Sequence, residues 1–255
     1  MTAIILLIAG GCKKDNEPAQ FTNYNLMVKD VLGVSGTVTF TENTISSATI
    51  DIVLVNAPTG NHPANLYMKS EVENGSVAIA LNPVDETGKS STLVSTMNYP
   101  TLIGFDGSIK VLSSSTEPDI ILAQGDIGGN ILTTINMSYT MDIVGAFGVS
   151  GTAVFAKRVN ENTLITISLT GTIPGETYPA TINLGSIASV GGGPVVKELS
   201  NVNGTTGKSY TNIQKLEGGT KITYENWLVY DGYLNIYQAP VSIENIICQG
   251  NIGSN

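Results

Sequence analysis

The chain has 255 residues, of which 42% are hydrophobic and 13% are charged, and its formal net charge is −9. A chain of this length forms one large domain or two ordinary ones, and it can bury a core without disulfide staples. It has only 12 Lys and Arg residues and no basic stripe. This excludes non-specific nucleic-acid binding, which depends on clustered positive charge.

Residues 1–11 form a short apolar run, MTAIILLIAGG, directly before Cys12. The run is too short to cross a bilayer as a helix. It resembles the end of a bacterial lipoprotein signal peptide, in which small residues precede a cysteine that becomes lipidated. No Lys or Arg precedes the run, a departure that is compatible with a reading frame starting upstream of Met1. The alternative is an apolar N-terminus with a chance cysteine.

Residues 12–22, from Cys12 through KKDNEPAQ, are polar, contain a proline and lack apolar periodicity. This pattern predicts a flexible linker after the lipidated cysteine. The stretch CKKDNE resembles the starts of lipoproteins of the Bacteroidetes, in which Lys and acidic residues after the cysteine mark export to the cell surface. We therefore expect a lipid-anchored protein of the outer membrane or cell surface, whose membrane contact is the acylated Cys12.

Residues 23–130 and 131–255 both show the period of two that is typical of half-buried strands. Apolar residues alternate with Thr, Ser or Gly in GTVTFTE at 36–42 and in TLITISLTG at 163–171. Pairs such as TG, DG and GG separate the strands. Several short strands in roughly 110 residues predict an all-β fold with two tandem antiparallel β-sandwich domains.

The two halves repeat one another in order. GVSGTVTF at Gly33 matches GVSGTAVF at Gly148, and the spacing between matched blocks grows only from 115 to 125 residues along the chain. The other matched blocks are TGKSSTLV with TGKSYTNI, FDGSIKVL with YDGYLNIY, and AQGDIGGN with CQGNIGSN. The sequence therefore predicts a tandem duplication with its boundary near residue 130.

These blocks resemble the CHRD domain, the module first named from chordin. The resemblance covers residues 33–130 and 148–255 and rests on five modest blocks in order in each copy. It implies a Greek-key β-sandwich like that of copper/zinc superoxide dismutase, on a secreted or lipid-anchored protein.

The resemblance also implies histidines that this chain lacks. Family members often carry His-Pro-Ala-His-x-His and a further histidine in the strand after Asp-Gly, a set suited to copper or zinc. Here His62 is the only histidine in the chain. The other matching positions hold Asn65, Tyr67, Leu112, Tyr178, Thr181, Asn183 and Tyr237. We predict no metal and no cofactor, with His62 as a structural remnant of the motif.

Two further residues are interpreted as core. Cys248 matches Ala123 of the first copy, which indicates a buried, inert thiol. Trp227 matches Leu102, which favours core packing, although a sugar-stacking tryptophan remains an alternative.

Tyr233, Asn235 and Tyr237 share one face of a predicted strand and form a candidate binding face, with cross-strand packing as the alternative. With one histidine, a Ser-His-Asp triad is not expected, and no carboxylate pair stands out for sugar hydrolysis. The predicted function is therefore non-catalytic binding of a protein or glycan partner at the cell surface. The alternative is a metal-binding, degenerate relative of superoxide dismutase, and a third idea is a carbohydrate-binding accessory lipoprotein.

Overall fold

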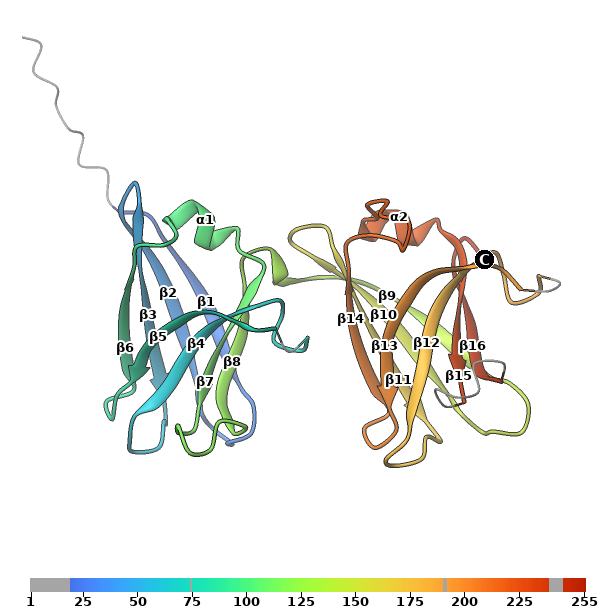
Figure 1. Cartoon of the computed structure of the whole chain (residues 1–255), viewed down its shortest axis with the longest axis horizontal. Coiled ribbons are helices and arrows are strands. Elements are labelled where there is room, and N and C mark those ends of the chain that lie inside the picture. The colour runs from blue at the N-terminus through green and yellow to red at the C-terminus, as the bar shows by residue number, and fades with distance from the viewer. Residues whose placement is uncertain (1–18, 74, 190–191, 239–244) are drawn as a thin grey trace, which may run out of the picture.

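The computed structural model describes residues 19–73, 75–189, 192–238 and 245–255 (Figure 1). The chain forms two all-β units joined by a short connection. The first unit contains β1 (Phe21–Val28), β2 (Ser35–Thr44), β3 (Ser47–Val55), β4 (His62–Met68), β5 (Val77–Val84), β6 (Lys89–Val94), α1 (Tyr99–Ile103), β7 (Gly107–Leu112) and β8 (Ile121–Ile127). The connection is a 3₁₀ turn, η1 (Gly128–Asn130).

The second unit contains β9 (Leu132–Ile143), β10 (Ser150–Arg158), β11 (Thr163–Thr170), β12 (Thr177–Leu184), β13 (Val195–Asn203), β14 (Lys208–Ile213), α2 (Tyr224–Leu228), β15 (Asp231–Tyr237) and β16 (Ile246–Gly253). The predicted boundary at residue 130 lies at the end of η1. Phe21 and Thr22 already belong to β1, two residues before the predicted start of the first domain.

The two units share one strand order. The first is an eight-stranded sheet, β5-β4-β7-β8-β1-β2-β3-β6, and the second is a closed barrel, β10-β11-β14-β13-β12-β15-β16-β9. When the order of the closed barrel is read from β13 round to β14, each strand takes the place of the first-unit strand whose number is eight lower. The prediction of an all-β chain with two antiparallel units is confirmed, but the sheets curve into barrel-like units, and a sandwich of two separate sheets is not confirmed.

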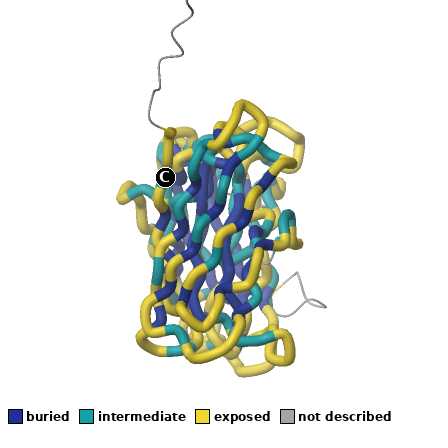
Figure 2. Tube along the Cα trace, turned by 90° about the vertical axis from the view of Figure 1, so that its left-hand side faces the viewer, coloured by how far each residue is buried: buried dark blue, intermediate teal, exposed yellow. Residues whose placement is uncertain are grey.

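Each unit has its own apolar core inside the curved sheet, and exposed residues gather in the loops at the ends (Figure 2). The alternation of the sequence explains the core: in β3, Ala48, Ile50, Ile52 and Leu54 point inward while the residues between them are more exposed. The short helices cap the cores. Trp227 of α2 is fully buried against Phe155, with ring centroids 5.7 Å apart, as expected for a core residue.

Candidate functional site

His62 is buried inside the first unit, with 2% of its surface exposed. Its Nδ1 lies 2.7 Å from the carbonyl oxygen of Ser113, and its Nε2 lies 2.8 Å from that of Pro58. The ring therefore links the chain before β4 to the chain after β7. A metal ion would have to displace one of these carbonyl contacts to reach a ring nitrogen.

The other positions at which CHRD domains often carry histidine do not converge on His62. The side chains of β4 alternate, so His62 faces the interior while Asn65 and Tyr67 lie on the outer face of the sheet. On that face Lys110 of β7 places its Nζ over the Tyr67 ring, 5.4 Å from the centroid. An amine in this position disfavours a second cation, so the residues present do not fit a copper or zinc centre. Among the described residues, no group of three or more His, Cys, Asp or Glu side chains could hold a metal ion.

The candidate binding face of the second unit is largely covered. Tyr233 and Asn235 are 4% and 3% exposed, and Tyr237 is half-buried. The Tyr233 hydroxyl accepts a hydrogen bond of 2.8 Å from the Gly193 amide, so the backbone at Gly193 lies over it. Asn235 donates to the Tyr237 hydroxyl at 3.3 Å. Of the three side chains, only Tyr237 reaches the surface, and binding by this face stays a prediction.

The two cysteines have separate settings. Cys12, the predicted lipidation site, lies outside the described residues. Cys248 is fully buried in β16, and burial raises the pKa of its thiol to about 12. A thiol in this state is a poor nucleophile at neutral pH, in agreement with an inert core residue.

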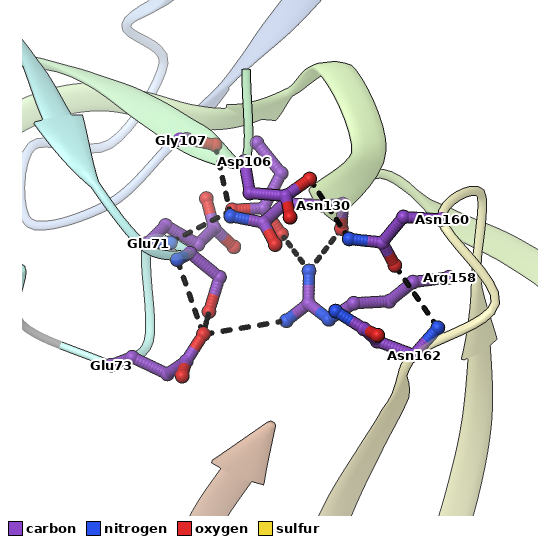
Figure 3. Close-up of polar contacts among 10 residues, drawn as sticks. Glu71, Glu73, Asp106, Gly107, Asn130, Arg158, Asn160 and Asn162 are labelled. Carbon is purple, nitrogen blue, oxygen red and sulfur yellow. Dashed lines mark hydrogen bonds and ion pairs between the residues drawn. The ribbon is translucent and has the colours of Figure 1, made fainter. Parts of the chain in front are cut away.

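The two units are tied together by Arg158, the only arginine in the chain (Figure 3). Arg158 ends β10 in the second unit and is fully buried. Its guanidinium donates to the Asn130 carbonyl oxygen in the connection and, at 3.1 Å, to Asp126 of β8 in the first unit. A Glu73 carboxylate oxygen lies 4.0 Å away. One buried cation thus contacts carboxylates and a carbonyl from three parts of the chain.

A second set of contacts surrounds this ion pair. Asn160 Nδ2 donates to Asp106 of the first unit at 2.8 Å. The amides of Val159 and Asn160 donate to the carbonyl oxygens of Ile131 and Gly129. The turn after β10 therefore runs along η1. Backbone hydrogen bonds hold the connection between the units against this turn of the second unit.

Three ionisable groups at this junction have pKa values that are shifted mainly by burial. Burial raises the pKa of the Asp126 carboxyl above its usual range, although the Glu71 amide and Arg158 act in the opposite direction. Burial, and then repulsion by Asp126, also raise the pKa of Glu71. Burial lowers the pKa of Lys110, while Glu71 acts in the opposite direction. Burial at the junction therefore disfavours the charged form of each of these three groups.

A polar cleft of about 680 Å³ lies between the two units. One wall is the segment from Lys69 to Glu73, which follows β4, and the other is formed by β13 and β14. Its charged lining residues balance in number: Lys69, Lys197, Lys208, Glu73, Glu198 and Glu217. Lys197 and Glu217 form an ion pair of 2.7 Å across the wall.

The cleft continues toward the predicted tyrosine face. A smaller hollow of about 290 Å³ shares Glu198, Leu199 and Asn201 with the cleft and has Tyr237 on its far side. The exposed edge of the predicted binding face and the inter-unit cleft are thus neighbouring parts of one surface along β13.

The pattern of the sequence did not reveal Arg158 or the cleft. Within the repeat, Arg158 stands where the first copy has Asn43, a residue that is exposed and bonds locally to Thr49. The substitution of a neutral residue by the only arginine was a usable signal, because a charge found in one copy alone marks a position where the copies have different surroundings.

Comparison of the chain with protein-family models, with curated proteins and with solved structures gives no significant match. No helix within the described residues is both long and apolar enough to cross a membrane.

Proposed function

We propose that this chain is a non-catalytic, lipid-anchored binding protein of the bacterial cell envelope, which meets a protein or glycan partner at the cell surface. The N-terminal pattern supports the anchor, since small residues lead directly to Cys12 and a polar linker follows. A tether of this kind leaves two folded units free to project from the membrane.

Both units are proposed to be CHRD-like modules with Greek-key connectivity. The strand order supports this: β12, β13 and β14 are consecutive neighbours, and β11 lies beside β14. This is the arrangement in which three successive strands are joined by a fourth that returns alongside. The first unit has the same cyclic order, as expected after duplication of one module.

The observation that carries the binding role is the cleft built by both units. A duplicated module gains such a surface only when the copies are held in a fixed relation, and the buried Arg158 contacts provide that relation. The cleft volume lies within the range of small-molecule sites, about 300–1,000 Å³.

Cell fractionation of the full chain and of Cys12→Ser tests the anchor. We expect the full chain in the outer-membrane fraction, sensitive to protease added to whole cells, and the variant in the soluble fraction. Equal distribution of the two proteins would refute lipidation at Cys12. Protection of the full chain from protease in intact cells, with digestion after lysis, would refute the surface orientation.

Chemical cross-linking on intact cells tests the binding role. We expect the full chain to form a cross-linked product that Tyr237→Ala or Asn201→Ala weakens, whereas Leu32→Ser, at an exposed site outside the cleft, should leave it unchanged. A product unaffected by the first two variants would contradict the placement of the site along β13.

A further inference from the structure

The two units differ at the end of the curved sheet that lies opposite the short helix, which we call the mouth of the unit (Figure 1). The mouth of the first unit includes the loops after β3 and β7. There the His62 ring contacts the carbonyl oxygen of Pro58, in the first of these loops, and that of Ser113, in the second. The ring therefore spans the mouth and links its two sides.

The corresponding link is missing in the second unit. Tyr178 takes the place of His62 in the repeat. Its hydroxyl accepts a hydrogen bond of 2.9 Å from the Ile173 amide, in the loop after β11. On the other side of the mouth, after β15, the Gln238 amide donates to the Asn245 carbonyl oxygen, and Gln238 Oε1 accepts from Asn245 Nδ2. Within the described ranges no hydrogen bond joins Tyr178 to Gln238, so the side chain of Tyr178 does not span the mouth.

A hollow of about 250 Å³, the mouth pocket, lies at this place in the second unit. Its floor includes the side chains of Val149, Tyr178 and Ile247, which are buried. Its rim includes Phe147 and Ile173, which are large apolar residues exposed to solvent. The mouth pocket shares no lining residue with the inter-unit cleft, so the two are separate sites.

The size and lining of the mouth pocket select a small apolar group. At about 30 Å³ for each water-sized atom, the pocket has room for about eight non-hydrogen atoms. A phenyl ring with a short side arm has this size, and a long acyl chain is too large. Val149 and Ile247 would cover such a group from below and Phe147 from the rim, and removal of apolar surface from water favours this arrangement.

The charge at the rim selects the polar end of the ligand. Glu176 is the only charged residue that lines the mouth pocket. It is exposed, and among the described residues it forms no ion pair. A carboxylate in this position attracts a cation and repels an anion, although solvent keeps the preference small. Charge complementarity therefore favours an ammonium group over a hydroxyl or a carboxylate.

We propose that the mouth pocket of the second unit binds a small primary amine with an apolar body. The ammonium group pairs with Glu176, and the body lies against Val149 and Ile247. This site goes beyond the proposed function, because it is separate from the inter-unit cleft and takes a free small molecule. The first unit does not bind the amine, since His62 spans its mouth.

The test is calorimetric titration of the full chain with three probes that share a phenyl ring and differ in charge: phenethylamine, phenethyl alcohol and hydrocinnamate. Saturation-transfer NMR shows which part of each probe contacts the protein. We expect saturable binding of phenethylamine with a dissociation constant of about 1 mM or tighter. Phenethyl alcohol should bind about threefold more weakly, because it lacks the exposed ion pair, and hydrocinnamate should bind most weakly.

Two variants locate the site, and both change exposed residues, so the unfolding midpoint in urea should stay unchanged. Phe147→Ser removes the apolar rim and should weaken the binding of phenethylamine at least about fivefold. Glu176→Gln should remove the preference for the amine over the alcohol while leaving the binding of the alcohol unchanged. Leu32→Ser, at the position of the first unit that matches Phe147, is the control and should bind like the unaltered chain.

Three outcomes would overturn the proposal. The absence of saturable phenethylamine binding would reject the pocket as an amine site. Equal binding by Phe147→Ser and Leu32→Ser, with unchanged midpoints, would reject the mouth of the second unit as the place of binding. Hydrocinnamate that binds as tightly as phenethylamine, or an amine preference that persists in Glu176→Gln, would reject the contact between the ammonium group and Glu176.

Discussion

At the scale of single residues, His62 should act as a structural tie. The change His62→Ala removes a buried ring that contacts the carbonyl oxygens of Ser113 and Pro58. We expect a loss of about 1–3 kcal/mol in the free energy of unfolding, measured with urea, because the hydrogen bond and the packing of the buried ring are both lost. Asn65→Ala, on the outer face of the same strand, should cost less. Zinc or copper that raises the midpoint of the unaltered chain, but not that of His62→Ala, would contradict this role.

Glu71 is a residue whose charge should cost stability. Its pKa is raised by burial and by Asp126, so the folded state favours the protonated carboxyl. The contribution of the protonated Glu71 carboxyl to folding stability is fully present below the unfolded-state pKa near 4.5. It is lost as the pH rises through the raised folded-state pKa. Glu71→Gln should therefore raise the thermal midpoint at pH 7, with little difference at pH 3.5. The exposed Glu86→Gln serves as control, and a lower midpoint for Glu71→Gln at pH 7 would refute the argument.

At the scale of elements, the glycine of the repeated QGDIG and QGNIG blocks lets the last strand of each unit pass close to the first. A Cβ at Gly125 would lie 2.2 Å from the Asn25 carbonyl oxygen, and one at Gly250 would lie 2.1 Å from that of Thr140. These contacts are with backbone, so a strand would have to shift. Gly125→Ala and Gly250→Ala should each destabilise the protein by about 1–3 kcal/mol in urea unfolding.

A matched glycine separates this effect from ordinary backbone entropy. At Gly218, a surface position, a Cβ would meet nothing within 4 Å. Gly218→Ala should be neutral or slightly stabilising. If Gly125→Ala and Gly250→Ala lower the free energy of unfolding no more than Gly218→Ala does, the close contacts between the strands would not be limiting.

At the scale of the whole molecule, Arg158 should set how the two units lie together. Arg158→Met leaves Asp126 buried without its cation, and breaking a buried pair in this way costs about 3–5 kcal/mol. We expect unfolding in two separate steps and a larger radius of gyration by small-angle X-ray scattering, since the units lose their fixed relation.

The neighbouring residue gives the control for this change. Lys157 pairs with Glu225 within the second unit and is partly exposed, so Lys157→Met removes a cation without touching the junction. Adding Asp126→Asn to Arg158→Met should recover part of the lost stability but not the compact arrangement. A radius of gyration for Arg158→Met equal to that of the unaltered chain would refute the role of Arg158 as the tie.

Much of the fold could be predicted because it depends on local sequence patterns and on the repeat. The alternation in β3 and β10 identifies strands, and the repeated blocks occupy equivalent strands in both units: β2 and β10, β6 and β14, β7 and β15, β8 and β16. The burial of Cys248 and Trp227 followed from their small or apolar counterparts in the other copy. Less of the site could be predicted, because the Tyr233 hydroxyl is covered by the backbone at Gly193, which is distant from it in the sequence.

By itself, the sequence determined the all-β class, the duplication and the alternating core, since these depend on residues a few positions apart or on one half compared with the other. Tertiary structure alone decided the contacts of His62 with two carbonyl oxygens, the burial of Arg158 between the units and the closure of the second unit's barrel at β13 and β14. Each of these depends on contacts between segments far apart in the chain. A period of two specifies which face of a strand is buried, but it does not specify what lies against that face.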